Sequence, residues 1–120
     1  MPELAYSSNA NSPVERIMPQ DIDAERAVLA AMLLGSDSEV AENAMFKLSA
    51  DEFYRPAHRK IFEAMCELYN NGVPIDQLSL ADRLKSRGDL DAIGGKPYIV
   101  DLANNMYALA NWSHHADIIK

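Results

Sequence analysis

The sequence has few of the features that mark secreted or membrane-spanning proteins. Cys66 is the only cysteine among 120 residues, so no disulfide can form within the chain. No apolar run approaches the roughly 18 residues that a membrane-spanning helix needs. No basic and then apolar leader of the signal-peptide kind opens the sequence. We therefore expect a cytoplasmic protein that makes no contact with a membrane.

Basic residues are also scarce. The chain has 11 Lys and Arg against 18 Asp and Glu, which gives a net charge of −7. A surface that binds the phosphates of DNA is normally basic, so this balance argues against direct DNA contact. We interpret the one basic cluster, which is Arg55, His58, Arg59 and Lys60, as a solvated helix face.

Strand signals are absent, and the apolar residues repeat at helical spacing instead. The longest segment with one period is 51–72, and we expect its helix to organise the fold. Pro56 suits the start of this helix and Gly72 its end, while Ser49 and Glu52 match a capping box just before it. On its polar face, Glu63 and Glu67 form a like-charge step that gives no support within the helix.

Further helices are expected on both sides of this segment. Residues 22–34, capped by Asp21, are apolar nearly all round, so other helices should surround them. Shorter helices are predicted over 36–46, 97–103 and 110–120. Another is predicted from a cap at Ser79 to a stop at Gly88, with Leu78 on its apolar stripe. The fold class is therefore all-α, as a compact orthogonal bundle of six or seven short helices. Residues 1–20, with three prolines, are predicted to be a flexible arm, and residues 21–120 one domain.

The histidines and carboxylates have structural explanations. His114 and His115 are adjacent, so they point in different directions on a helix and do not suit a metal site. His58 is predicted to be a partly buried histidine that hydrogen-bonds to a neighbouring loop. The carboxylates of Asp21, Asp23 and Glu25 complement a helix start, which explains them without a metal.

A possible phosphate loop at Gly94-Gly95-Lys96 fails on its spacing. Leu90 and Pro97 stand where the pattern needs a glycine and a Ser or Thr, so the paired glycines are interpreted as a helix break. We expect no catalytic residue, no cofactor site and no metal site. Tyr98 and Trp112 are large aromatics for which core packing is the first interpretation and a protein interface the second.

Three segments in a fixed order resemble a known family. They are MPQDIDAERAVLAAML, DEFYRPAHRKIFEAMCELYNNGVPID and LADRLKSRGDLDAIGGKPYIVDLAN. Together they resemble the N-terminal domain of DnaB-type bacterial replicative DNA helicases, over residues 18–120. Two stretches, 104–107 and 112–115, depart from the usual pattern of that family.

The resemblance implies a helical collar domain. In that family, hairpins pair two collar domains, and the dimers assemble on a hexameric motor ring that uses ATP and magnesium. The last predicted helix ends at Lys120 without a terminator, which predicts a fragment with a truncated C-terminal helical hairpin and no motor. The fragment itself is then not an enzyme and needs no cofactor.

The function implied by the resemblance is assembly and partner docking. The expected partners are other copies of the domain, the DnaG-type primase and, in some systems, a helicase loader. Tyr98, Trp112 and Ile119 are the candidate interface residues. One alternative is a free-standing helical adaptor, a second is a helical DNA-binding domain, and a small enzyme has no residue set to support it.

Overall fold

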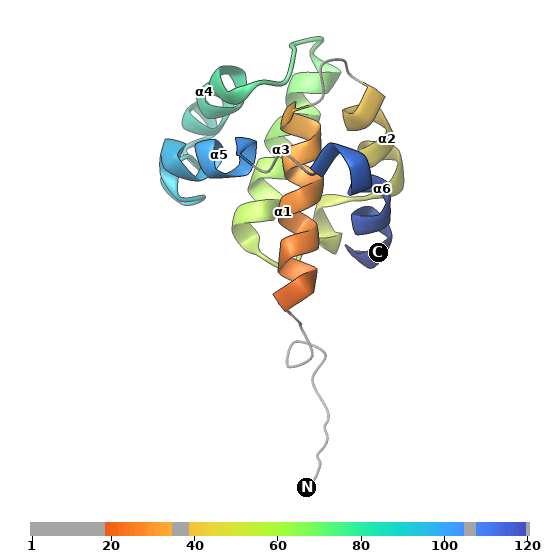
Figure 1. The fold of residues 1–120 in the computed structure, drawn as a ribbon. Helices are drawn as coiled ribbons and strands as arrows, with labels where there is room; N and C mark the ends of the chain where they lie inside the picture. Colours follow the sequence, from red (N-terminus) through yellow and green to blue (C-terminus); the bar gives the residue numbers. More distant parts are fainter. Residues whose placement is uncertain (1–18, 35–38, 105–107, 120) are drawn as a thin grey trace, which may run out of the picture.

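The fold is formed by helices alone within residues 19–34, 39–104 and 108–119, which are the residues that the computed structural model describes. These helices are α1 (Pro19–Leu34), α2 (Glu39–Lys47), the 3₁₀-helix η2 (Ala50–Glu52), α3 (Pro56–Asn70), α4 (Gln77–Arg87), α5 (Gly95–Ala103) and α6 (Ala108–Ile119). The predicted all-α bundle of six or seven short helices is confirmed (Figure 1). None of the described helices has the length and apolar character needed to cross a bilayer.

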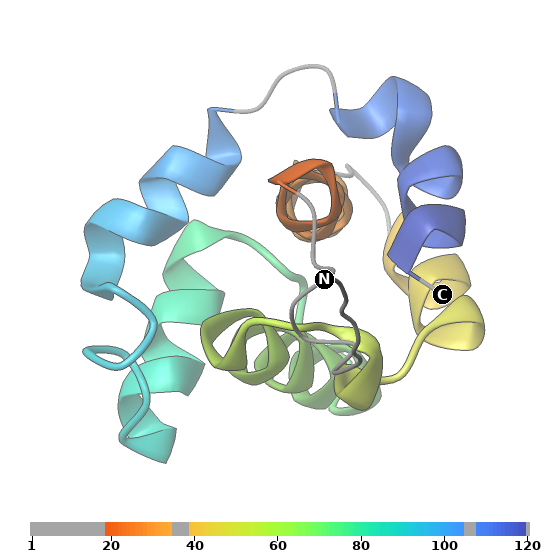
Figure 2. The same ribbon diagram turned by 90° about the horizontal axis from the view of Figure 1, so that it is seen from below.

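Helix α1 lies at the centre of the bundle. Figure 2 looks along this helix and shows the other elements arranged around it. It contacts α2, α3, α5 and α6, and every residue from Ala27 to Leu33 is buried. The expectation that an all-round apolar helix is surrounded by others is confirmed. The expectation that α3 organises the fold is wrong, because a clear apolar stripe marks a helix with one solvent face, whereas the central helix has none.

Helix α1 also begins earlier than predicted. Its first residue is Pro19, so Asp21 lies within the first turn and is not the residue that precedes the helix. Pro19 and Gln20 had been assigned to the arm, and the helix includes both of them. Residues 1–18, the rest of the predicted arm, lie outside the described residues.

Helix α3 has the predicted boundaries. The backbone N–H of Ser49 donates to the Glu52 carboxylate at 2.8 Å, which closes the turn of η2 before the helix. Pro56 is the first residue of α3, where its missing N–H leaves no bond unmade. Gly72, with φ of 72°, takes the left-handed conformation just past the helix end.

Helix α4 differs from its prediction at one end. Asp76, not Ser79, is the N-cap: the Ser79 N–H donates to the Asp76 carboxylate at 2.7 Å, and the Asp76 N–H donates to the Ser79 hydroxyl at 3.0 Å. Leu78 is 79% exposed, because it lies about 200° around the helix from the buried Leu80. The predicted stop is confirmed at Gly88, whose φ is 78°.

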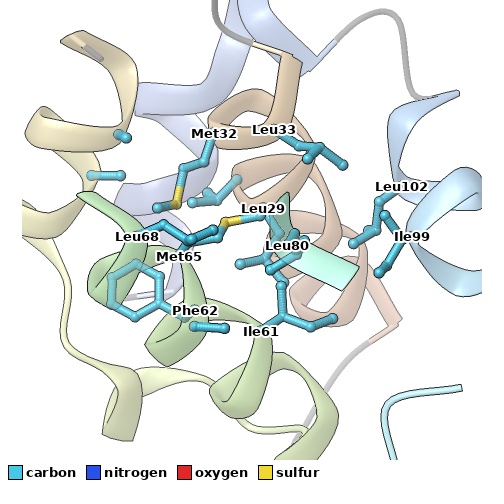
Figure 3. Close-up of a cluster of buried hydrophobic side chains, with 14 of the residues drawn as sticks. Leu29, Met32, Leu33, Ile61, Phe62, Met65, Leu68, Leu80, Ile99 and Leu102 are labelled. Carbon is cyan, nitrogen blue, oxygen red and sulfur yellow. The ribbon is translucent and has the colours of Figure 1, made fainter. Parts of the chain in front are cut away.

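The hydrophobic core joins the central helix to the other five α-helices of the described residues. Figure 3 shows side chains of α1, α3, α4 and α5 converging, among them Leu29, Met32, Ile61, Phe62, Met65, Leu68, Leu80, Ile99 and Leu102. The rings of Phe53 and Phe62 pack with centroids 5.0 Å apart. Burial of these apolar side chains against the central helix α1, which acts as a rod through the bundle, holds the helices together.

Candidate functional site

Two ionisable side chains lie inside this core. Glu25 of α1 is 2% exposed and His58 of α3 is not exposed at all. A buried carboxylate or imidazole is costly unless hydrogen bonds and opposite charge compensate for the lost water. The partners of these two residues therefore define the most distinctive polar feature of the described residues.

The Glu25 carboxylate receives three donors from the start of α3. The backbone N–H of Tyr54 donates to it at 2.6 Å and that of Arg55 at 3.4 Å. His58 Nδ1 lies 2.7 Å from the same carboxylate. The N-terminal end of a helix carries a partial positive charge, so the carboxylate sits where that field favours it.

Tyr98 of α5 completes the arrangement. Its hydroxyl lies 2.6 Å from His58 Nε2, and the two rings stack at 21° with centroids 5.9 Å apart. Burial raises the pKa of the Tyr98 hydroxyl above its usual value, although the positive charges of Arg26 and Arg55 oppose the shift. We call Glu25, His58 and Tyr98 the buried hydrogen-bond chain.

The buried hydrogen-bond chain joins α1, α3 and α5. Its order of carboxylate, imidazole and hydroxyl is that of a hydrolytic triad. A triad, however, needs a hydroxyl that substrate can reach beside a cavity. A cavity of about 300 Å³ between α1 and α5 is lined by Asp23, Arg26, Asp101 and Asn104. None of the three residues of the buried hydrogen-bond chain lines this cavity. The arrangement suits a link between helices and not a nucleophile.

His58 therefore differs from its prediction. It is fully buried, not partly, and its partners stand on two helices, not on a loop. Glu25 also differs, because it compensates the start of α3 and not the start of its own helix. Sequence spacing alone could not show that residues 33 and 40 positions from His58 meet its ring.

The basic cluster is likewise not a uniformly solvated face. His58 is in the core, and Lys60 pairs with Asp89 at 3.3 Å. Arg59 donates to the backbone carbonyls of Phe53 at 2.7 Å and Tyr54 at 3.3 Å. The Arg59 bonds connect the start of α3 to the turn before it. Three members of the basic cluster, His58, Arg59 and Lys60, thus have partners within the domain.

A second polar cluster connects α3 to α4. Arg87 contacts Glu67 at 2.6 Å, Glu63 at 2.8 Å and Asp89 at 3.2 Å. The two glutamates carry like charges and do not stabilise each other within α3. The guanidinium of Arg87, on the neighbouring helix, provides the opposite charge for both of them. The like-charge step is thus a feature of packing between helices.

An open groove of about 480 Å³ runs beside this cluster. Its lining mixes apolar and polar side chains, namely Met45, Leu48, Ser49, Ala50, Phe62, Glu63, Cys66, Glu67, Asn70 and Arg87. Burial and the charges of Glu63 and Glu67 raise the pKa of the Cys66 thiol to about 11. The thiol therefore stays protonated near neutral pH and is a poor nucleophile.

The three candidate interface residues lie on two helices. Tyr98 is half-buried on α5. Ile119, near the end of α6, packs partly against the core, and Trp112 belongs to α6 with its side chain outside the described residues. Helices α5 and α6 lie on opposite sides of α1, so these residues do not share one face (Figure 2).

Comparison with known proteins decides the family. The family model described as the DnaB-like helicase N-terminal domain matches residues 17–120. The chain belongs to this family. The crystal structure of the N-terminal domain of DnaB helicase from Mycobacterium tuberculosis superposes with a TM-score of 0.77 and 38% identity, covering 84% of this chain and 72% of that chain.

Curated relatives of this DnaB-like domain are helicases. The replicative DNA helicase DnaB of Mycobacterium leprae is 38% identical over 121 residues, covering 98% of this chain and 20% of that protein. The replicative DNA helicase DnaC of Bacillus subtilis is 35% identical over 106 residues, covering 88% of this chain and 23% of that protein. The chain thus spans about a fifth of the length of these relatives.

The sequence did carry a signal for the buried hydrogen-bond chain of this DnaB-like domain. Glu25 precedes the buried Val28 and Leu29 by three and four positions, so it shares their face. His58 stands in the same relation to Ile61 and Phe62. An acidic residue and an imidazole on two apolar helix faces need partners in the core, and each is the natural partner of the other.

Proposed function

We propose that this DnaB-like domain is the non-catalytic assembly and partner-docking part of a replicative DNA helicase. The observation that carries the proposal is the family match over residues 17–120, together with relatives that are themselves replicative DNA helicases. The ATP-dependent motor, with its magnesium, then belongs to the part of the full-length protein outside these residues. The domain acts in the cytoplasm, during DNA replication.

Exposed apolar side chains support a role in binding proteins. Phe46 of α2 is 92% exposed, and Val100 of α5 and Ile118 of α6 are also exposed. Large apolar residues at the centre of protein interfaces contribute much of the binding free energy. Phe46 and Ile118 are the sequence neighbours of Lys47 and Asp117, whose ion pair at 3.6 Å links α2 to α6.

The proposed partners follow from the family. They are other copies of the domain within a hexamer, the DnaG-type primase and, in some systems, a loader. The net charge of −7 is unfavourable for phosphate binding, so DNA is contacted by other parts of the helicase.

The first test separates the domain from the motor. ATP hydrolysis is measured for the purified chain and for the full-length protein, each with and without single-stranded DNA. We expect turnover by the full-length protein only. Measurable turnover by the pure chain would show that it is not a passive docking domain.

The second test concerns the partners. Hexamer assembly and primase binding are measured for full-length protein carrying Phe46→Glu, with Ser86→Glu, at an exposed position of α4, as the control. We expect Phe46→Glu to weaken at least one of the two associations about tenfold or more, and Ser86→Glu to leave both unchanged.

A stop codon directly after residue 120 in the gene would instead favour the free-standing adaptor.

A further inference from the structure

The buried hydrogen-bond chain allows only certain positions for its protons. The Glu25 carboxylate already accepts the N–H groups of Tyr54 and Arg55, so it acts as an acceptor toward His58 as well. His58 Nδ1 must then carry a proton and donate to Glu25. In the neutral ring Nε2 has no proton, so the Tyr98 hydroxyl donates to it.

One additional proton, taken from solvent, reverses the last bond. With both ring nitrogens protonated, His58 Nε2 becomes a donor, and the Tyr98 oxygen must accept. The hydroxyl proton of Tyr98 then has to point to another acceptor. Of the charged groups that act on Tyr98, Arg26 and Arg55 have no acceptor atoms and Glu25 already accepts from His58, so Asp101 is the remaining carboxylate on the domain, and a carbonyl or carboxylate of a partner is the other choice.

We propose that the Tyr98 hydroxyl is a proton-controlled hydrogen-bond donor on α5. While His58 is neutral, the hydroxyl is directed into the core and is not offered to a partner. When the Glu25–His58 pair gains a proton, the hydroxyl turns outward and donates to a carbonyl or carboxylate of a docked protein. This inference rests on the proposed docking function and adds a regulatory input to it.

Both proton states are compatible with the fold. With neutral His58 the pair keeps one negative charge, which the start of α3 stabilises. With charged His58 it becomes a hydrogen-bonded ion pair at 2.7 Å. Because the Glu25 carboxylate and both His58 ring nitrogens keep a partner in each state, proton uptake changes the direction of a bond and does not unfold the helices.

The charged groups around the chain are few. Facing it are Glu25 and Arg26 from α1, Arg55 before α3, and Asp101 from α5. Several charged groups on the other elements packed against α3 have partners of their own. These are Glu42 with Tyr69, Glu52 with Ser49, Arg83 with Glu67, and Arg87 with Glu63, Glu67 and Asp89. The Glu25–His58 pair is thus the titratable unit that reaches Tyr98.

The switch is tested on the domain alone by NMR. His ring nitrogens and the Tyr ring carbon that bears the hydroxyl are isotope-labelled and followed while the pH is varied over the range in which the domain stays folded. We expect the His58 nitrogens, the Tyr98 carbon and the α5 amides to change with one shared midpoint. Tyr98→Phe should abolish the response of α5 while the His58 ring still titrates, and Tyr54→Phe should alter neither.

Two results would overturn the proposal. One is a His58 ring whose nitrogen shifts stay constant over this range; the other is a Tyr98 carbon that does not follow the His58 ring. Because these spectra need no partner, they judge the switch separately from the docking function. Primase binding by full-length protein at both ends of the pH range then tests the consequence, since Tyr98→Phe should remove any dependence on pH that the wild type shows.

Discussion

Glu25 concentrates three hydrogen bonds on one buried carboxylate. Its donors are the backbone of Tyr54, the backbone of Arg55 and the ring of His58. Removal of the carboxylate leaves all three donors in a largely buried region, and each then lacks the partner that compensated for its burial. The free-energy contribution of this residue therefore exceeds that of an ordinary surface carboxylate.

We expect Glu25→Ala to lower the free energy of unfolding by about 3 kcal/mol, since it breaks a buried, hydrogen-bonded pair. Urea denaturation measures this loss. Asp23→Ala, two positions away and exposed, should change stability by no more than about 0.5 kcal/mol. Equal effects of the two substitutions would mean that the buried pair contributes nothing special.

Cys66 gives a prediction about reactivity. Its pKa is raised from 9.0 to about 11, so at pH 8 the thiolate fraction is about 100-fold lower than for an unperturbed thiol. Alkylation by iodoacetamide, followed by mass spectrometry, should be slower by a similar factor in the folded chain than in the urea-unfolded chain. The stabilisation from keeping this thiol protonated is complete below pH 9.0 and disappears as the pH rises through about 11. Equal alkylation rates in both states would contradict the shift.

At the scale of the helix, periodicity and position carry different information. Helix α3 is predictable because one face is apolar and the other charged, and the expected start at Pro56 and stop signal at Gly72, just past the last helical residue Asn70, are confirmed. Helix α1 has no polar face, so no amphipathic period marks it in the sequence. The lack of a polar face is nevertheless what places it at the centre, since all its sides must be covered. Caps were less predictable: Asp76 and Ser79 bond to each other reciprocally, and the spacing alone did not show which begins the helix.

The buried face of α3 supplies the prediction at this scale. Phe62 is in the core and its ring packs against Phe53. We expect Phe62→Ala to cost about 3–5 kcal/mol in chemical denaturation, because it removes apolar burial and leaves a cavity. Leu78→Ala, at an exposed position of α4, should cost far less. A loss below about 1 kcal/mol for Phe62→Ala would place the ring elsewhere than in the core.

At the scale of the whole molecule, the fold class was predictable and the central link was not. Apolar spacing and glycine or proline positions specify helices locally, which is why the prediction of six or seven short helices agrees with the part of the chain that the structure describes. Glu25, His58 and Tyr98 come together only when α1, α3 and α5 are docked. The spacing within each helix marks Glu25 and His58 as buried, but it does not show that Tyr98 joins them. Whether Tyr98, Trp112 and Ile119 contact partners stays a prediction, as does the docking function itself.

The arrangement around one rod also predicts how the molecule unfolds. Because α1 contacts four other helices, none of them can leave without exposing apolar surface of the centre. We expect one cooperative thermal transition, with the same midpoint by circular dichroism and by fluorescence of Trp112. Two separated midpoints would show that part of the bundle is stable alone.

The enclosed position of α1 has a consequence for how such domains diverge. A volume change in the rod must be matched at once in several surrounding helices, since its faces are all in contact. The outward positions of those helices, such as Phe46, carry no such constraint. Substitutions on the outward positions of the surrounding helices can therefore change the surface of the domain without any matching change in the central helix.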